Sequence, residues 1–263
     1  MLPTPDTSHV PYSRVYEPAE DSFLMIDTLA LPAETAFLQG RFGSRKEPPL
    51  PPPLVVEIGS GSGVVLAFVA AQAAHLFGPS TRSRPLALAV DVNEFACAAT
   101  RETVRRATAT TPGESKASKE STAAMFLGAV RADLASVLRP GQVDVLLFNP
   151  PYVPTATLPA NENAALRQDA FARDSHLLEL AYAGGHDGME TTDRLLRELP
   201  AVLSPRGCAY VLLCAQNRPE AVKERIRSWT TAGDGRSWHA ETVGSSGKQA
   251  GWEKLQIVRI WRD

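Results

Sequence analysis

Short apolar runs of strand length alternate along the chain with longer segments in which apolar residues recur at helical spacing. We expect strands at Leu54–Ile58, Leu86–Val90, Met125–Val130, Val143–Phe148, Cys208–Cys214 and Leu255–Trp261. We expect helices over Ala19–Leu31 and around Val64–Phe77 and Glu94–Ala107. Strands that alternate with helices favour an α/β fold, in which a mostly parallel sheet is covered by helices on both faces.

Two segments interrupt this alternation. Five of the six residues from Pro48 to Pro53 are proline, which favours an extended connector over a helix or a central strand. Thr108–Thr122 is polar and low in complexity, as expected of a loop. We therefore predict a tail over residues 1–15 and one domain over residues 16–263, with insertions near 32–53 and 108–122.

The composition is that of a globular chain, with 44% apolar and 21% charged residues. The 27 basic residues nearly balance the 29 acidic ones, and this argues against a protein that grips nucleic acid through its phosphates. The longest apolar run, Val64–Ala71, is shorter than the roughly 18 residues that a membrane-spanning helix requires. The first residues also lack the apolar segment of a signal peptide.

The 3 cysteines are odd in number and lack CxxC spacing. This excludes both a disulfide framework and a zinc site built from cysteines, and it favours a reducing compartment. We therefore expect no bound metal, no membrane and no direct nucleic-acid partner. We expect the chain in the cytoplasm, with the nucleus as a second location.

Glycines at positions 59, 61 and 63 separate an apolar strand from an apolar helix in the segment VVEIGSGSGVV. Glycine permits positive φ angles and close ligand approach, and the following helix presents free N–H groups. A dinucleotide-binding motif would need a third glycine where Val64 stands. The spacing found here, with Glu57 before it, is typical of S-adenosylmethionine enzymes. A plain turn between strand and helix is the alternative.

Two further acids follow the next two predicted strands. Asp91 ends a strand at the edge where open α/β sheets bind ligands, and its carboxylate can accept from both hydroxyls of a ribose. Asn93 is better placed than Asp91 to cap the following helix. Asp133 is suited to accept from an adenine amino group, although alone it could equally be a loop acid. The three acids together strengthen the ligand interpretation.

The strand over Val143–Phe148 leads directly into Asn149-Pro150-Pro151-Tyr152. Because a residue before proline is excluded from the helical region, this tetrapeptide should be stiff and extended. The Asn149 side-chain oxygen and the Pro150 carbonyl can then accept both hydrogens of a planar NH₂ group. Tyr152 offers a face against which an amide or a base can stack. A simple strand-ending turn is the alternative.

These motifs together resemble the class I S-adenosylmethionine-dependent methyltransferases that modify planar nitrogens. The segments YEPAEDSFL at 16–24, AGGHDG at 183–188 and LSPRG at 203–207 are similar to the eukaryotic and archaeal branch of HemK-like glutamine methyltransferases. The resemblance implies a Rossmann-like fold with a seven-stranded sheet. It implies S-adenosyl-L-methionine as cofactor and N5-methylation of the glutamine in the Gly-Gly-Gln motif of a class 1 translation termination (release) factor.

The resemblance also assigns roles to individual residues. The implied cofactor-binding residues are Ser22, Glu57, Gly59, Gly61, Asp91, Asp133, Leu134 and Asn149. The implied substrate-binding residues are Asn149, Pro150, Pro151 and Tyr152, of which Asn149, Pro150 and Tyr152 are the catalytic ones. Helix N-capping is the alternative explanation for Glu20–Ser22. We expect no dedicated general base, with catalysis by positioning and electrostatics.

The resemblance further implies a partner. Bacterial relatives carry an N-terminal helical domain, which we do not expect here because only 15 residues precede Tyr16. The branch that this chain resembles forms a heterodimer with a small zinc-binding activator subunit. Three alternatives stay open: N6-methylation of adenine in DNA, methylation of protein lysine, and an inactive scaffold with a methyltransferase fold.

Overall fold

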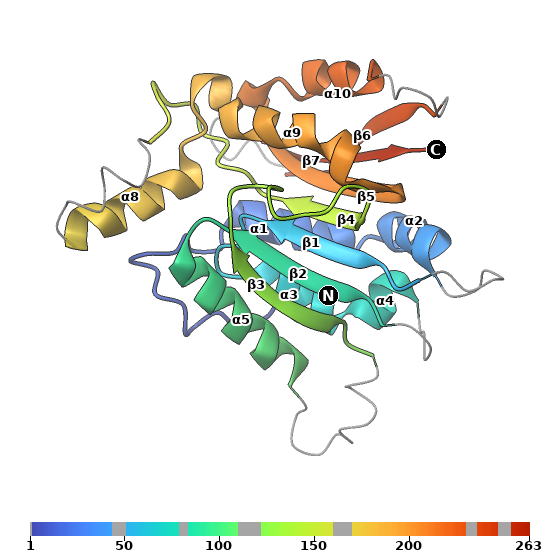
Figure 1. The fold of residues 1–263 in the computed structure, drawn as a ribbon, viewed down its shortest axis with the longest axis horizontal. Coiled ribbons are helices and arrows are strands. Elements are labelled where there is room, and N and C mark those ends of the chain that lie inside the picture. Colours follow the sequence, from blue (N-terminus) through green and yellow to red (C-terminus); the bar gives the residue numbers. More distant parts are fainter. Residues whose placement is uncertain are drawn as a thin grey trace.

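One mixed sheet runs through the molecule (Figure 1). The computed structural model describes residues 2–43, 51–78, 84–109, 122–159, 170–229, 236–246 and 254–263. The strands in these ranges are β1 (Leu54–Ile58), β2 (Leu86–Asp91), β3 (Met125–Arg131), β4 (Val143–Phe148), β5 (Leu203–Cys214), β6 (Trp238–Ser245) and β7 (Leu255–Arg262). Their order is β3-β2-β1-β4-β5-β7-β6, and only β7 runs antiparallel to its neighbours. The predicted seven-stranded, mostly parallel sheet is confirmed.

Helices cover both faces of this sheet. The described helices are α1 (Glu20–Leu29), α2 (Pro32–Phe42), α3 (Val64–Ala71), α4 (Ala73–Phe77), α5 (Glu94–Thr108), α8 (Ala170–Tyr182), α9 (Glu190–Val202) and α10 (Pro219–Arg227). Helices α1 to α5 contribute to the core on one face, whereas α9 and α10 pack on the other. None of the helices in the described part of the chain has the length and apolar character needed to span a membrane.

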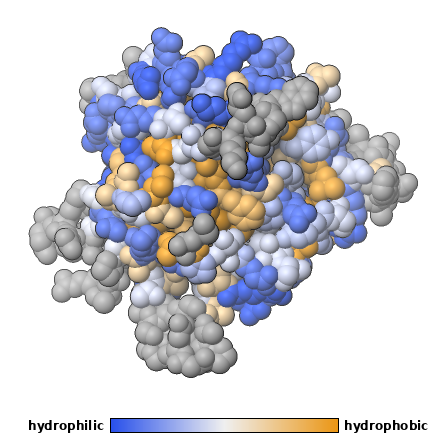
Figure 2. Space-filling view, turned by 180° about the vertical axis from the view of Figure 1, so that it is seen from behind, coloured by the Kyte–Doolittle hydropathy of each residue, from blue (hydrophilic) through white to orange (hydrophobic). Residues whose placement is uncertain are grey.

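The central strand β4 shows how the two core layers arise. Its residues alternate, so that Val145 and Leu147 belong to the core layer beneath α3 while Leu146 and Phe148 belong to the layer beneath α9. All residues of β4 are buried, as expected of a strand covered on both faces. On the side opposite to that of Figure 1, apolar surface gathers near the centre and hydrophilic residues surround it (Figure 2).

The structure differs from the predicted elements in several places, and helices α2, α8, α9 and α10 were not predicted. The expected helix over Val64–Phe77 divides into α3 and α4 at Gln72. Strand β5 starts at Leu203, before the predicted Cys208, and therefore includes Pro205. Strand β6 was not predicted, because most of its residues are exposed or half-buried and its apolar alternation is weak. Much of the two predicted insertions, residues 44–50 and 110–121, lies outside the described residues.

Helix α2 falls within the first predicted insertion, yet a buried ion pair attaches it to the sheet. Glu34 is 3% exposed and accepts hydrogen bonds from Arg259 on β7, at 2.8 and 2.9 Å. The Tyr210 hydroxyl on β5 donates to the same carboxylate at 2.8 Å. Burial raises the pKa of Tyr210, so this hydroxyl stays a donor. The region from Pro32 to Phe42 is therefore part of the core packing.

We predict that Glu34→Ala lowers the free energy of unfolding by about 3 kcal/mol, because it leaves Arg259 without its buried partner. Glu241→Ala is the matched control, since Glu241 pairs with the same arginine at 3.3 Å from a side chain that is 58% exposed. Its effect should stay below about 1 kcal/mol. Urea unfolding of both variants checks this, and equal losses would contradict the structural role of Glu34.

Candidate active site

A cavity of about 830 Å³ opens at the carboxyl ends of the central strands. Neighbouring strands β1 and β4 continue to opposite faces of the sheet, and such switch points are where open α/β sheets bind ligands. The predicted site residues that line the cavity are Ser22, Glu57, Gly59, Gly61, Asp91, Asp133, Leu134, Asn149, Pro150 and Pro151. Tyr152 is the predicted site residue that is absent from the described lining. The fold thus assembles a site from residues spread over 130 positions of sequence.

The glycine turn between β1 and α3 has a backbone that other residues would strain. Gly63 has a φ of 78°, and a Cβ atom there would lie 2.6 Å from the Cα atom of Thr100 on α5. Gly61 has a φ of 51°, and its N–H donates to Asp91 at 2.9 Å. These contacts hold the glycine turn against β2 and α5, and the backbone of the turn lines the cavity.

Glu57 and Asp91 are acids buried at the ends of adjacent strands, with exposed fractions of 4% and 7%. Glu57 accepts from the N–H of Leu66 at 3.0 Å, and Asp91 accepts from those of Gly61 and Asn93 at 2.9 and 2.8 Å. Burial raises the pKa of both carboxyls, well above the usual range for Glu57, and the backbone donors offset part of the shift. The site therefore holds two acids in an environment that disfavours their charge.

The third acid lies in a different environment. Asp133 follows β3, has a side chain that is 56% exposed, and forms an ion pair with Arg194 of α9. The next residue, Leu134, is buried and has a φ of 47°, a left-handed backbone that costs on the order of 1–3 kcal/mol for such a residue. Arg194 also lines the cavity, and it was not predicted because no local motif in the sequence marks it.

Asn149 carries a polar atom without a partner. The chain leaves the sheet at this residue, since Pro150 and Pro151, which follow it, have no N–H to donate to a sheet ladder. The Asn149 side-chain oxygen is buried and accepts no hydrogen bond from any described residue. An unsatisfied buried acceptor costs about 1–3 kcal/mol, and a ligand N–H group placed there would remove that cost. This oxygen is therefore suited to bind an N–H donor within the cavity.

Tyr152 does not offer the stacking face that the sequence predicts. Its side chain is 9% exposed and belongs to the core cluster of α1 and α3, with its hydroxyl 3.5 Å from Asp21. The Tyr152 carbonyl accepts from the Asn217 side chain at 3.1 Å. These tertiary contacts direct the side chain of Tyr152 into the core. Tyr152 therefore packs beneath the residues that line the cavity and does not line it.

Ser22 reaches the cavity from the first turn of α1. The N-cap of this helix is Ala19, which provides no side-chain hydrogen bond, so the capping explanation for Glu20–Ser22 is wrong. The Ser22 hydroxyl donates to Asp21 at 3.1 Å, and both residues are buried. Both also line the cavity, and they place a hydroxyl and a carboxylate beside the glycine turn.

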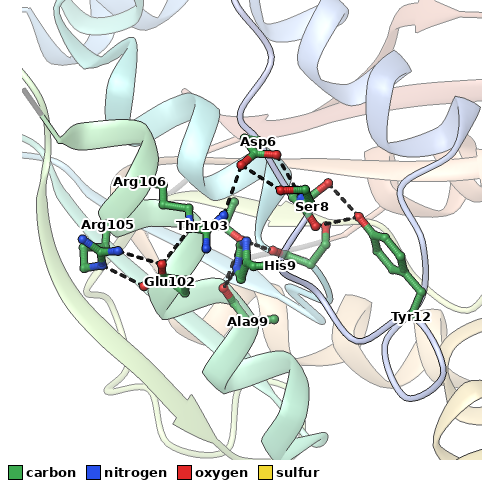
Figure 3. A network of polar contacts seen from close by, with 11 residues as sticks. Asp6, Ser8, His9, Tyr12, Ala99, Glu102, Thr103, Arg105 and Arg106 are labelled. Carbon is green, nitrogen blue, oxygen red and sulfur yellow. Dashed lines mark hydrogen bonds and ion pairs between the residues drawn. The ribbon is translucent and has the colours of Figure 1, made fainter. Parts of the chain in front are cut away.

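The predicted tail over residues 1–15 packs on α5 where it is described, from residue 2 on. Asp6 forms an ion pair with Arg106 at 3.2 Å, and the His9 Nε2 atom lies 3.3 Å from a main-chain carbonyl of α5 (Figure 3). These contacts carry the chain to Tyr16, which lines the cavity. The N-terminal segment thus forms part of the wall.

Helix α8, which was not predicted from the sequence, supplies another part of the cavity wall. Its cavity-lining residues are His176, Leu177, Leu180 and Ala181. Residues 160–169 before this helix lie outside the described residues. Within the described ranges, the acids, cysteines and histidines form no group of three or more that could hold a metal ion.

Glu57→Gln should change the pH dependence of stability. Because burial raises the pKa of Glu57 in the folded state, the wild type loses stability as pH rises from the unfolded-state pKa through the folded-state pKa. Glutamine has no charge to bury and keeps an oxygen for the Leu66 N–H. The variant should therefore gain stability over the wild type from pH 5 to pH 8, measured by urea unfolding of the ligand-free chain. A difference that is constant with pH would contradict this.

Comparisons with known proteins agree with this geometry. No family model matches the chain. The human and mouse proteins named methyltransferase HEMK2 are 34% and 33% identical to it, and each alignment covers 98% of this chain and at least 95% of the relative. The eRF1 methyltransferase catalytic subunit mtq2 of Schizosaccharomyces pombe is 30% identical over 100% of this chain and 96% of its own length. With the seven-stranded sheet and the glycine turn, this similarity shows that the chain belongs to the HemK-like family of class I S-adenosylmethionine-dependent methyltransferases.

Proposed function

We propose that this chain transfers a methyl group from S-adenosylmethionine to the glutamine side-chain amide in the Gly-Gly-Gln segment of a class 1 translation termination factor. The observation that carries the proposal is the buried, unpartnered Asn149 oxygen in the cavity at the end of β4. An acceptor in this state selects a substrate that brings an N–H donor. The name of the fission yeast relative, which identifies eRF1 as the protein it methylates, supports the choice of substrate.

The residues of the cavity fit the cofactor. A carboxylate has about four lone-pair sites, so the two backbone N–H groups on Asp91 leave it free to accept from ribose hydroxyls as well. Asp133 keeps an oxygen for an adenine amino group while its other oxygen pairs with Arg194. The buried carboxyls of Glu57 and Asp91 supply acceptor oxygens, and a bound ligand that carries positive charge would favour their ionised form. The cavity volume also lies within the range of small-molecule sites.

The chemistry of the transfer follows from acceptors on the turn after β4. Bound S-adenosylmethionine supplies an electrophilic methyl group on a positively charged sulfur. An amide nitrogen is a poor nucleophile, because its lone pair is delocalised into the carbonyl. Hydrogen bonds from the two amide hydrogens to the Asn149 oxygen and the Pro150 carbonyl enrich this nitrogen and fix the amide plane. As the N–C bond forms, the bond from the methyl group to sulfur breaks, and the nitrogen then loses one of its protons to water. Two successive prolines hold these acceptors rigidly, so most of the gain comes from positioning.

We predict that Asn149→Ala lowers kcat for methylation of the termination factor by at least about a hundredfold, as loss of a key polar contact in an active site does. The fold should be preserved, since the Asn149 oxygen accepts no hydrogen bond from the described chain. Gln142→Ala, which removes an exposed side-chain amide, is the matched control and should be fully active.

The measurement is transfer of a labelled methyl group to three substrates: the termination factor, a lysine-containing peptide and a DNA duplex. Methylation of the termination factor alone would support the proposal. Methylation of lysine or adenine in its place would favour one of the two alternative enzymes. Cofactor binding without any transfer would favour the scaffold.

We further propose that a small zinc-binding activator subunit covers the β3 edge of the sheet and forms a heterodimer with this chain. Among the described strands, β3 pairs only with β2. Its residues Met125, Leu127 and Val130 have exposed fractions of 49%, 51% and 39%. An exposed apolar edge strand is a template for pairing with another chain, and proteins normally cover such an edge. A second subunit that adds a strand would satisfy both the apolar side chains and the unpaired backbone.

We predict that Leu127→Asp weakens binding of the co-expressed activator by at least about tenfold, since it places a charge in the centre of the proposed interface. Val137→Asp is the matched control, because Val137 is 48% exposed but lies outside β3. Affinity is measured by pull-down and calorimetry on the purified heterodimer components. Equal binding by both variants would place the activator on another surface.

A further inference from the structure

Two residues that line the cavity carry buried polar atoms without hydrogen-bond partners in the described part of the chain. One atom is the Asn149 oxygen, and the other is the Nε2 atom of His176 on α8. The proposed function accounts for the first and makes no use of the second. A buried imidazole nitrogen in a ligand cavity is a group that a bound molecule would satisfy.

The surroundings of His176 differ from those of the acids. His176, Leu177, Leu180 and Ala181 recur at helical spacing, so they form one face of α8, and this face lines the cavity. Leu158 and Pro159, from the segment after β4, add to the same apolar lining. Of these six residues His176 is the polar one, whereas the acidic residues of the lining lie at the ends of β1, β2 and β3 and on α1. One part of the cavity is thus apolar with a single imidazole.

Contacts at both ends hold α8 in place. Near its start, Asp174 accepts from Arg14 at 2.9 Å, which ties the helix to the N-terminal segment. At its end, the Val153 N–H donates to the Tyr182 carbonyl at 3.0 Å, and the Gly184 N–H donates to the Val153 carbonyl at 2.8 Å. Val153 lies shortly after Asn149 in the chain. These backbone hydrogen bonds therefore join α8, which carries His176, to the segment that carries Asn149.

We infer that His176 donates a hydrogen bond from Nε2–H to a carbonyl oxygen of the substrate segment, and this rests on the proposed function. The groups that bind the glutamine NH₂ at Asn149 and Pro150 are acceptors, so the substrate's carbonyl oxygens need a donor from elsewhere. A neutral imidazole carries one N–H donor. Two glycines before the glutamine leave the substrate carbonyls open to approach, because glycine has no side chain. His176 is thereby a residue that positions and selects the substrate.

Three variants test this in the heterodimer with full-length termination factor. His176→Phe keeps a ring of similar size and removes the donor, so KM for the termination factor should rise about tenfold with cofactor affinity unchanged. His176→Gln keeps an N–H donor and should recover most of the loss. His75→Ala is the matched control, because His75 is an exposed histidine of α4 outside the described cavity lining, and its KM should equal that of the wild type.

The outcomes separate this inference from the proposed function. A wild type that does not methylate the termination factor would overturn both. An active wild type whose KM is unchanged in His176→Phe would overturn the inference alone. A loss of cofactor affinity in His176→Phe that accompanies the rise in KM would also overturn the inference. So would an equal rise in KM in His176→Phe and His176→Gln together with a lowered unfolding temperature. The last two results would mean that His176 serves the cofactor or the packing of α8, respectively.

Discussion

Burial of two carboxylates at the ends of adjacent strands is the constraint on which the rest of the site depends. Glu57 and Asp91 lose most of their hydration, and an unpaired charge in such a place would cost several kcal/mol. Backbone N–H groups of the glycine turn and of the next two helix starts compensate for this loss. They reach the acids only because β1 and β2 are parallel neighbours and the turn adopts left-handed backbone angles. The strand order, the glycine turn and the positions of the helix starts are thus all needed to bring N–H donors to Glu57 and Asp91.

Buried polar groups have different roles in the two parts of the molecule. Away from the cavity, hydrogen-bonded sets join one element to another: Glu34 with Arg259, and Asp144 with Ser204 and Arg206, the latter three joining β4 to β5. Such sets stabilise the attachment of one element to another and need no ligand. Asn149 and His176 instead reach the cavity with an atom unsatisfied. Thr28 and Thr192 also carry unsatisfied buried hydroxyls, but they lie outside the described cavity lining, so it is the combination of an unsatisfied atom with a place in the lining that distinguishes Asn149 and His176.

Local sequence patterns were enough to predict most of the strands and the acids at the strand ends that are proposed to bind the cofactor. The limits of β1 and β4 match the predicted runs, and Glu57 and Asp91 stand where strand ends predict them. Features that depend on tertiary contacts could not be predicted. The direction of Tyr152 is set by the core cluster and by Asn217, and both are remote in sequence. His176 reaches the cavity only because the chain around Arg14 and Val153 anchors α8. Strand β6 lacks a strong apolar alternation, and pairing with β7 determines it.

The burial of Tyr152 bears on the choice among nitrogen substrates. An adenine amine and a glutamine amide both offer a planar NH₂ with a delocalised lone pair, so the acceptors at Asn149 and Pro150 serve either. A flipped base also needs faces on which its large ring can stack, and Tyr152 would have provided one directly beside these acceptors. A glutamine side chain needs no such face and gains from the apolar lining along α8. A lysine ammonium has no lone pair until it loses a proton, whereas the turn after β4 offers neutral acceptors. The amide is the one substrate of the three that these groups suit without further help.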